Sequence, residues 1–209
     1  MNADGSNHEP THELTDDEIE RAAEAVRAGE TVVYPTETVY GLGADATDPA
    51  AVERVYELKD RPREKPLSVG FGSVEAALSL VPASDRAARF ARAFLPGPVT
   101  VVVDRGDALA AELTDGEPRV GIRVPDHGTA RALADAAGPI TATSANRSGA
   151  GSVRRVADLD PRIRDGCAAV LDGGETPGGE STVVDPDRGV IHRAGPLADE
   201  IRGWLASRP

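Results

Sequence analysis

Cysteine, aromatic residues and long apolar runs are scarce in this chain of 209 residues. The single cysteine, Cys167, excludes a disulfide bond within one chain and a cysteine-based metal cluster, and we expect it to be a small buried apolar residue. No segment approaches the roughly 18 to 20 uninterrupted apolar residues of a membrane-spanning helix, and the acidic N-terminal segment lacks the features of a secretory signal. We therefore expect a soluble, cytoplasmic protein.

Positive charge is also scarce, since 23 lysine and arginine residues face 35 aspartate and glutamate residues and the formal net charge is -12. This total disfavours non-specific attraction to nucleic acid or to an anionic membrane, because both need a positive face, although it is compatible with a local basic patch. The abundance of acidic residues, the few aromatics and the use of arginine in place of lysine favour a halophilic protein, one adapted to high salt.

Lysine occurs only at Lys59 and Lys65, six positions apart. One interpretation is that an ammonium group is chemically required in this stretch of a chain that otherwise uses arginine. The other is the chance survival of two surface lysines. Composition alone leaves both open.

The apolar pattern predicts a disordered acidic tail over 1–13 and one domain over 14–209. Strands and helices alternate early and strands cluster late, so we expect an α/β fold with a twisted, open, mixed β-sheet flanked by helices. We interpret 35–43 as a polar loop and 173–179 as a mobile glycine-rich loop. Expected helices cover 16–28, 49–59, 74–80, 85–94, 128–137 and 197–206, the last burying Leu205 and Trp204, and expected strands cover 31–34, 67–71, 100–103, 120–124, 140–143, 168–171, 181–184 and 190–193.

Small hydroxyls and lone charges stand at the ends of several expected strands. Polar groups in such places tend to converge in a crevice at the edge of a sheet, where α/β proteins bind ligands, although ordinary capping is the alternative for any single Ser or Thr. A partly buried guanidinium needs an anionic partner, either a ligand or an internal carboxylate. The residues concerned are Thr36, Arg123, Ser144, Asn146, Ser181, Thr182 and Arg193.

Several common catalytic motifs are absent from the sequence. It has no Walker-type phosphate loop, no dinucleotide fingerprint and no His-Glu-x-x-His, and no Gly-x-Ser-x-Gly presents a nucleophile, although a Ser-His-Asp triad is not excluded. His127 and His192 are isolated, which disfavours a zinc site held by the protein. What remains is a polyanion site. Lys59, Arg61, Arg123 and Arg193 would supply charge, and Ser144, Asn146 and Ser181 would supply hydrogen bonds.

Six ordered motifs over roughly 14–205 resemble the YrdC-like domain of L-threonylcarbamoyladenylate synthases, in its single-domain form. They are Pro35–Gly43 (PTETVYGLG), Lys59-x-Arg61-Pro62 with Lys65-Pro66-Leu67, Leu95–Thr100 (LPGPVT), Ser144-Ala145-Asn146, Ser181–Asp185 (STVVD) and Arg193–Pro196 (RAGP). The resemblance implies the YrdC-like fold with a positively lined cleft. It also implies a nucleotidyltransferase that condenses ATP, L-threonine and bicarbonate to threonylcarbamoyl-AMP and pyrophosphate, with Mg²⁺ carried by ATP.

The same resemblance implies roles for individual residues. Lys59 and Arg61 would be catalytic, and the product would serve the modification of a tRNA adenosine next to the anticodon, with tRNA or a transferase complex as a possible partner. Two departures stand out: Gly70 occupies the place of a larger polar residue, and the segment around Ser152 is rich in glycine and arginine. ATP would contact Lys59, Arg61, Ser144, Asn146, Ser152 and Arg193, and L-threonine would contact Thr36, Arg123, Ala142, Thr143 and Ser181.

Three alternatives use the same fold. A non-catalytic YrdC-like protein that binds double-stranded RNA or nucleotide would tend to lack the Lys-x-Arg and Ser-x-Asn motifs, which this chain keeps. A carbamoyl-transfer domain of the kind found in hydrogenase-maturation proteins would sit among zinc-finger modules, for which the cysteines are absent. A pure double-stranded RNA binder is disfavoured by the net charge.

Overall fold

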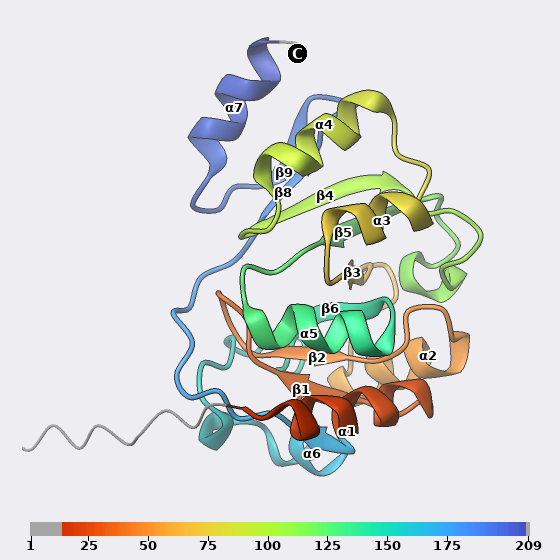
Figure 1. The fold of residues 1–209 in the computed structure, drawn as a ribbon, viewed down its shortest axis with the longest axis vertical. Helices are drawn as coiled ribbons and strands as arrows, with labels where there is room; N and C mark the ends of the chain where they lie inside the picture. Colours follow the sequence, from red (N-terminus) through yellow and green to blue (C-terminus); the bar gives the residue numbers. More distant parts are fainter. Residues whose placement is uncertain (1–13, 208–209) are drawn as a thin grey trace, which may run out of the picture.

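The computed structural model describes residues 14–207, so the tail expected over 1–13 lies outside the described residues. Seven α-helices and nine strands occur within this range (Figure 1). The helices are α1 (Asp16–Arg27), α2 (Pro49–Lys59), α3 (Val74–Leu80), α4 (Asp85–Phe94), α5 (Gly128–Ala137), α6 (Pro161–Asp165) and α7 (Ala198–Ser207). The strands are β1 (Val32–Tyr34), β2 (Gly41–Gly43), β3 (Ser68–Gly70), β4 (Val99–Asp104), β5 (Arg119–Arg123), β6 (Ile140–Ser144), β7 (Ala169–Val170), β8 (Thr182–Asp185) and β9 (Val190–Arg193).

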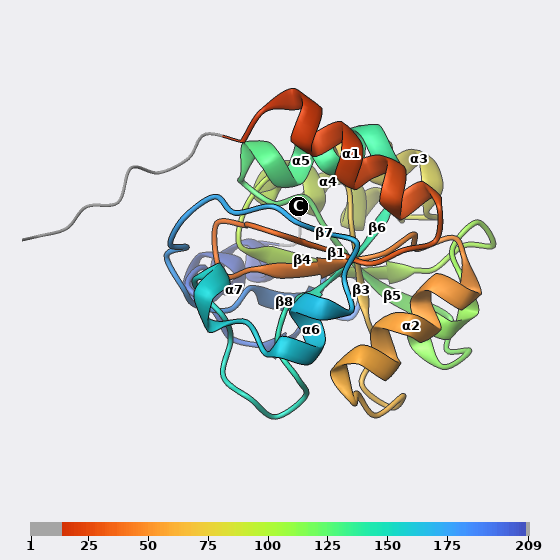
Figure 2. The ribbon, with the colours of Figure 1, turned by 90° about the horizontal axis from the view of Figure 1, so that it is seen from below.

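All nine strands belong to one open mixed sheet in the order β7-β1-β2-β6-β3-β5-β4-β8-β9. Three neighbouring pairs, β1 with β7, β3 with β5 and β4 with β8, are parallel, and the other five are antiparallel. Helices α1, α3, α4 and α5 lie on one face of the sheet and α2 and α6 on the other (Figure 2). The sequence prediction of an open mixed sheet flanked by helices is confirmed.

Local signals explain where the first helix begins. Thr15 caps α1 by accepting from the backbone N–H of Glu18, and the Glu18 carboxylate accepts from the backbone N–H of Thr15 over 2.9 Å, which completes a capping box. Ile19, Ala22 and Val26 then recur at helical spacing and are buried. Small residues on α1 let it pack closely against α5, which carries Ala130 and Ala134 in the same apolar cluster.

The prediction of a polar loop over 35–43 is wrong for its last three residues. Gly41–Gly43 forms β2, which pairs with both β1 and β6. Glycine is poor in strands, and here packing explains it: a Cβ at Gly41 would lie 2.7 Å from Cζ of Tyr34. The Tyr34 ring therefore lies across the strand where a side chain would otherwise stand. No signal within the segment itself indicates this.

Two helices differ from the sequence prediction. The short helix α6 was not predicted, although Asp160 accepts from the Arg162 N–H at its start and Ile163 is buried. Helix α7 buries Ala198 and Ile201, whereas the expected Trp204 and Leu205 are only half-buried.

Cys167 is half-buried, with Thr31 Oγ1 3.6 Å from its Sγ, and burial raises the pKa of its thiol. It is therefore less enclosed than the sequence prediction held. Among residues 14–207, none of the helices combines the length and the apolar character needed to pass through a membrane.

Candidate active site

A cavity of about 730 Å³ opens on the sheet and brings together residues from all three thirds of the chain. Strand alternation explains its position. In β5, Val120 and Ile122 enter the apolar core, while Arg119, Gly121 and Arg123 line the cavity. In β4, Val99, Val101 and Val103 enter the core, while Thr100 and Val102 line the cavity. The cavity thus lies on the face of these strands opposite the core.

Most of the residues predicted for the site line this cavity. They are Thr36, Arg61, Arg123, Ala142, Thr143, Ser144, Ser152, Ser181 and Arg193. Lys59 and Asn146 do not line it, and Thr182, another strand-end hydroxyl, is fully buried and accepts from the backbone N–H of Gly195 over 3.2 Å.

The lining is rich in positive charge although the whole chain is acidic. Five arginines, Arg61, Arg119, Arg123, Arg188 and Arg193, line the cavity beside two glutamates, Glu117 and Glu180. Four of these arginines have carboxylate partners, whereas Arg61 forms no ion pair within residues 14–207, so part of the positive charge of the lining is not neutralised. The cavity therefore suits ligands that carry carboxylate or phosphate groups.

One wall is built by the segment between β1 and β2. The Thr36 hydroxyl donates to the carbonyl of Val39 over 2.6 Å and accepts from the backbone N–H groups of Thr38 and Val39 at 3.2 Å each. This closes a local turn of the kind that Thr favours. Arg123, from the end of β5, donates through Nη2 to Glu37 Oε1 at 2.8 Å and to Thr38 Oγ1 at 2.9 Å. Arg123 therefore has an internal carboxylate partner.

Lys59 is the largest charged side chain in the buried interior, with an exposed fraction of 1 %. Its Nζ donates to the carbonyl of Asn146 over 2.6 Å and to the carbonyl of Ser144. Burial, followed by the nearby Arg61, lowers the pKa of Lys59 to about 7. A desolvated amine needs acceptors, and these two carbonyls supply them to a side chain that does not line the cavity.

Asn146 also serves the segment that follows β6. Its Nδ2 donates to the carbonyls of Arg147 and Ala150 at 2.8 and 2.7 Å, and its Oδ1 is buried without a hydrogen-bond partner within residues 14–207. Asn146 and Lys59 together fix the backbone of the Ser-Ala-Asn motif. Within this motif, Ser144 is the residue that lines the cavity.

Arg61 is oriented by backbone carbonyls of its own motif. Its Nε donates to the carbonyl of Lys65 over 2.8 Å and its Nη2 to the carbonyl of Pro66 over 2.9 Å. Burial lowers the pKa of Arg61, and the positive charge of Arg193 adds to that effect. Arg61 and Arg193 therefore form a cationic pair of side chains at the same cavity, although their residues lie far apart in the sequence.

The opposite wall comes from β8 and β9. Arg193 donates through Nε to the carbonyl of Ser181 and through Nη2 to its hydroxyl, at 2.9 Å each. The Ser181 hydroxyl also lies 2.9 Å from Thr100 Oγ1. Because the Ser181 oxygen already accepts from Arg193, its own proton goes either to Thr100 or to a ligand in the cavity.

Sequence reasoning did not identify several lining residues, among them Tyr34, Ser68, Thr100, Arg119 and His192. A signal existed for Thr100, a hydroxyl within the Leu95–Thr100 motif and an otherwise apolar strand. Another signal existed for Arg119, because Arg119 and Arg123 are four positions apart on one strand and so lie on the same face of the sheet. Arg119 Nη2 lies 2.7 Å from Oδ2 of the fully buried Asp185, so it is held by an ion pair at the rim.

The cavity is surrounded by cationic and hydroxyl side chains from several elements. Guanidiniums from separate strands and hydroxyls from Ser144 and Ser181 surround it. Such an arrangement can orient reactants and neutralise charge that develops on them. Within residues 14–207, no group of three or more His, Cys, Asp or Glu side chains is placed to hold a metal ion.

Comparison with known proteins gives consistent matches. Residues 24–195 match the Sua5/YciO/YrdC family model, which carries the description "Telomere recombination". The chain is 41% identical over 202 residues to the threonylcarbamoyl-AMP synthase of Bacillus subtilis, covering 91% of this chain and 57% of that protein. It is 38% identical over 172 residues to the threonylcarbamoyl-AMP synthase of Pyrococcus abyssi, covering 80% of this chain and 50% of that protein.

A solved structure of P. abyssi Sua5 in complex with L-threonine superposes with a TM-score of 0.81 at 34% identity, covering 92% of this chain and 59% of that one. The chain thus spans between half and three fifths of the length of these relatives.

Proposed function

The chain belongs to the Sua5/YciO/YrdC family, and we propose that it is a threonylcarbamoyl-AMP synthase, a nucleotidyltransferase that uses ATP, L-threonine and bicarbonate. The observation that carries the proposal is the convergence of Arg61, Arg123 and Arg193 on one cavity together with the hydroxyls of Ser144 and Ser181. The names of the relatives and the L-threonine bound to P. abyssi Sua5 support the same activity.

The proposed reaction has two steps. The amine of L-threonine attacks the carbon of bicarbonate, and loss of water leaves a carbamate on the nitrogen. A carbamate oxygen then attacks the α-phosphorus of ATP, the bond to the β-phosphate oxygen breaks, and pyrophosphate leaves. Neither step needs a covalent bond to the protein, so positioning and charge neutralisation would carry the rate.

Arg123 is the proposed ligand of the L-threonine carboxylate. The Nη1 atom of Arg123 makes no hydrogen bond to residues 14–207 and is not among the buried unpaired atoms, so its two N–H groups remain available to a ligand in the cavity. A cationic N–H donor is suited to a carboxylate because a hydrogen bond between opposite charges is stronger than one between neutral groups. Thr36, Thr143 and Ser181, with Ala142, would complete the amino-acid pocket around it.

Arg61 and Arg193 are the proposed ligands of the ATP phosphates, with hydroxyls from Ser144 and Ser152. ATP would enter with Mg²⁺ on its phosphates, so the ion would belong to the substrate and not to a cluster of protein side chains. Lys59 and Asn146 face the backbone and not the cavity, which supports an indirect role. They would hold the backbone around Ser144 in the position from which the Ser144 hydroxyl can contact the nucleotide.

The adenylate would serve the threonylcarbamoyl modification of a tRNA adenosine next to the anticodon. Its mixed anhydride of carbamate and phosphate is reactive, so an acceptor or a transferase complex would have to collect it promptly. The cationic cavity would hold it until then. We propose the cytoplasm as the place of this reaction, since its reactants and the tRNA are found there.

The activity is tested with purified protein, ATP, bicarbonate and L-threonine. We expect pyrophosphate release that depends on L-threonine, together with threonylcarbamoyl-AMP detected by mass spectrometry. Arg123→Gln should reduce this rate by roughly 100-fold, because a buried charged contact to the substrate is lost. Arg92→Gln is the matched control, since Arg92 pairs with Glu75 on an exposed surface. Pyrophosphate release without L-threonine, or tight binding of double-stranded RNA without any turnover, would contradict the proposal.

A further inference from the structure

Glu37 lies behind the wall of the cavity and contacts a residue that lines it. Arg123 and Thr38 line the cavity, whereas Glu37 does not. Glu37 and Thr38 come from the segment between β1 and β2, and Arg123 comes from the end of β5. The contact therefore joins two parts of the chain that meet only in the folded protein.

The geometry of this contact fixes one edge of the guanidinium. Glu37 Oε1 accepts from Arg123 Nη2 over 2.8 Å, and the exposed fractions of the two side chains are 15% and 13%. The same Nη2 donates to Thr38 Oγ1 over 2.9 Å, so it is held between a carboxylate and a hydroxyl. A free arginine side chain has many rotamers, and these two contacts remove most of that freedom before any ligand arrives.

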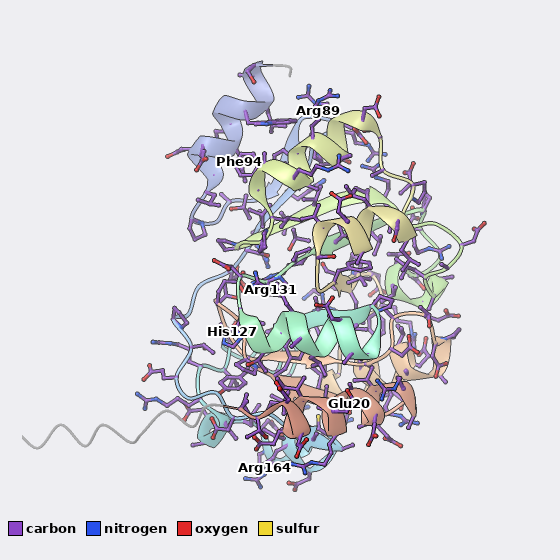
Figure 3. The ribbon with its side chains drawn as sticks, in the orientation of Figure 1. Glu20, Arg89, Phe94, His127, Arg131 and Arg164 are labelled. Atoms are coloured by element: carbon purple, nitrogen blue, oxygen red, sulfur yellow. The ribbon has the colours of Figure 1, made fainter. Side chains whose placement is uncertain are left out.

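The contact is not a saturated ion pair. Glu37 Oε2 and Arg123 Nε are both buried without a hydrogen-bond partner within residues 14–207. His127 stands at the start of α5 (Figure 3), and its Nδ1 is likewise buried and unpaired within that range. Buried polar atoms without partners are costly, so each of them calls for a physical explanation.

We propose that Glu37 is a positioning residue for the amino-acid substrate. It holds the Arg123 guanidinium so that Nη1 faces the cavity and donates to the L-threonine carboxylate. Glu37 itself touches no substrate, and its negative charge keeps Arg123 inside the protein when the cavity is empty. The inference rests on the proposed function, because it assumes that Arg123 binds this carboxylate.

Glu37→Gln tests the inference, since it keeps the size of the side chain and removes its charge. We expect the KM for L-threonine to rise about tenfold, as for the loss of one charge-assisted hydrogen bond. The KM for ATP should stay close to the wild-type value, while the melting temperature should fall because a largely buried ion pair is lost. Glu75→Gln is the matched control, because Glu75 pairs with Arg92 in an exposed ion pair.

A double-mutant cycle shows whether Glu37 acts through Arg123. If it does, Glu37→Gln added to Arg123→Gln should change the KM for L-threonine little beyond the effect of Arg123→Gln alone. Additive effects would overturn the inference. So would an unchanged or lower KM for L-threonine in Glu37→Gln, which would mean that Glu37 merely competes with the substrate for Arg123, or an equal rise in KM for both substrates.

Calorimetric titration of L-threonine into the folded protein separates this inference from the proposed function, because it needs no turnover. A wild-type chain that binds L-threonine but releases no pyrophosphate contradicts the proposed function alone. Unchanged binding in Glu37→Gln contradicts the inference alone, and a wild-type chain that binds no L-threonine contradicts both. If Glu37→Gln does not fold, Glu37→Asp replaces it: it keeps the charge but shortens the reach, and it should also weaken L-threonine binding.

Discussion

The ammonium of Lys59 and the backbone carbonyl of Asn146 lie 2.6 Å apart, and this contact fastens the end of α2 to the segment after β6. The backbone N–H of Ser148 donates to the carbonyl of Lys59 over 2.8 Å, so the two segments are joined in both directions. Ser144 reaches the cavity from the segment held in this way.

Lys59→Met should therefore reduce both activity and stability. Methionine has nearly the same length but no donor, so two buried carbonyls lose a partner. We expect the free energy of unfolding to fall by about 2 to 4 kcal/mol and pyrophosphate release to fall at least about 100-fold. Urea unfolding and a pyrophosphate assay measure the two effects. Lys65→Met is the control, because the Lys65 side chain is exposed. Lost activity at unchanged stability would instead indicate direct contact between Lys59 and the nucleotide.

The pH dependence of stability should carry a signature of the same side chain. Burial lowers the pKa of Lys59 from 10.5 to about 7, so the unfolded chain binds more protons than the folded one between these two values. The contribution of Lys59 to stability should rise as the pH increases through this window. A neutral amine still has two N–H donors for the two carbonyls.

The measurement is the difference in free energy of unfolding between wild type and Lys59→Met, at about pH 7 and about pH 9.5. Subtracting the variant removes the titration of other groups. A difference that is constant or that falls with pH would show that Lys59 keeps its ordinary pKa in the folded protein.

Gly41→Ala should destabilise the protein through Tyr34. The new Cβ would lie 2.7 Å from Tyr34 Cζ, and the ring is 1 % exposed, with its hydroxyl donating to the carbonyl of Thr141 over 3.2 Å. Because the new Cβ would displace a ring that is held in place by this hydrogen bond, we expect a loss of about 1 to 3 kcal/mol in the free energy of unfolding.

Gly128→Ala is the matched control for this substitution. A Cβ at Gly128 meets nothing within 4 Å among the residues that the structure describes, and the position opens α5. Its free energy of unfolding should stay level or rise slightly. Equal losses in the two alanine variants would show that the Tyr34 contact is not the cause.

Salt should increase the activity of the wild-type protein. The net charge of -12 makes the folded chain repel itself at low ionic strength, and salt screens that repulsion. We expect pyrophosphate release and melting temperature both to rise with KCl up to the molar range. Full activity and stability at low salt only, with losses as KCl is added, would refute adaptation to high salt.

Much of the fold is predictable from the sequence because its signals are local. The capping box at Thr15 and Glu18 and the helical spacing of Ile19 to Val26 locate α1 within one residue of its expected end. Strand β2 is not predictable in this way, because Gly41 and Gly43 are explained only by a ring that belongs to another strand. Helix α6 has a cap at Asp160 but is only five residues long, too short for periodicity to appear.

In the candidate site, too, local signals predict some features and tertiary contacts determine the others. The strand-end arginines and hydroxyls could be expected to converge, since strand edges bring such groups together, and Arg123, Ser144 and Arg193 do line one cavity. The direction of the Lys59 side chain could not be expected, because it depends on carbonyls of the β6 exit. Likewise the role of Glu37 depends on where β5 delivers Arg123.

The sheet order determines when the cavity forms during folding. Val99 of β4 pairs in parallel with Thr182 of β8, and β9 then pairs with β8 to deliver Arg193. Contacts between residues so distant in sequence form late, because a long loop must close first. During synthesis on the ribosome, α1 and the strands beside it can be complete while one wall of the cavity is still missing. Substrate binding would then be the last property that the growing chain acquires, and a chain interrupted before Ser181 would be unable to hold a reactive intermediate.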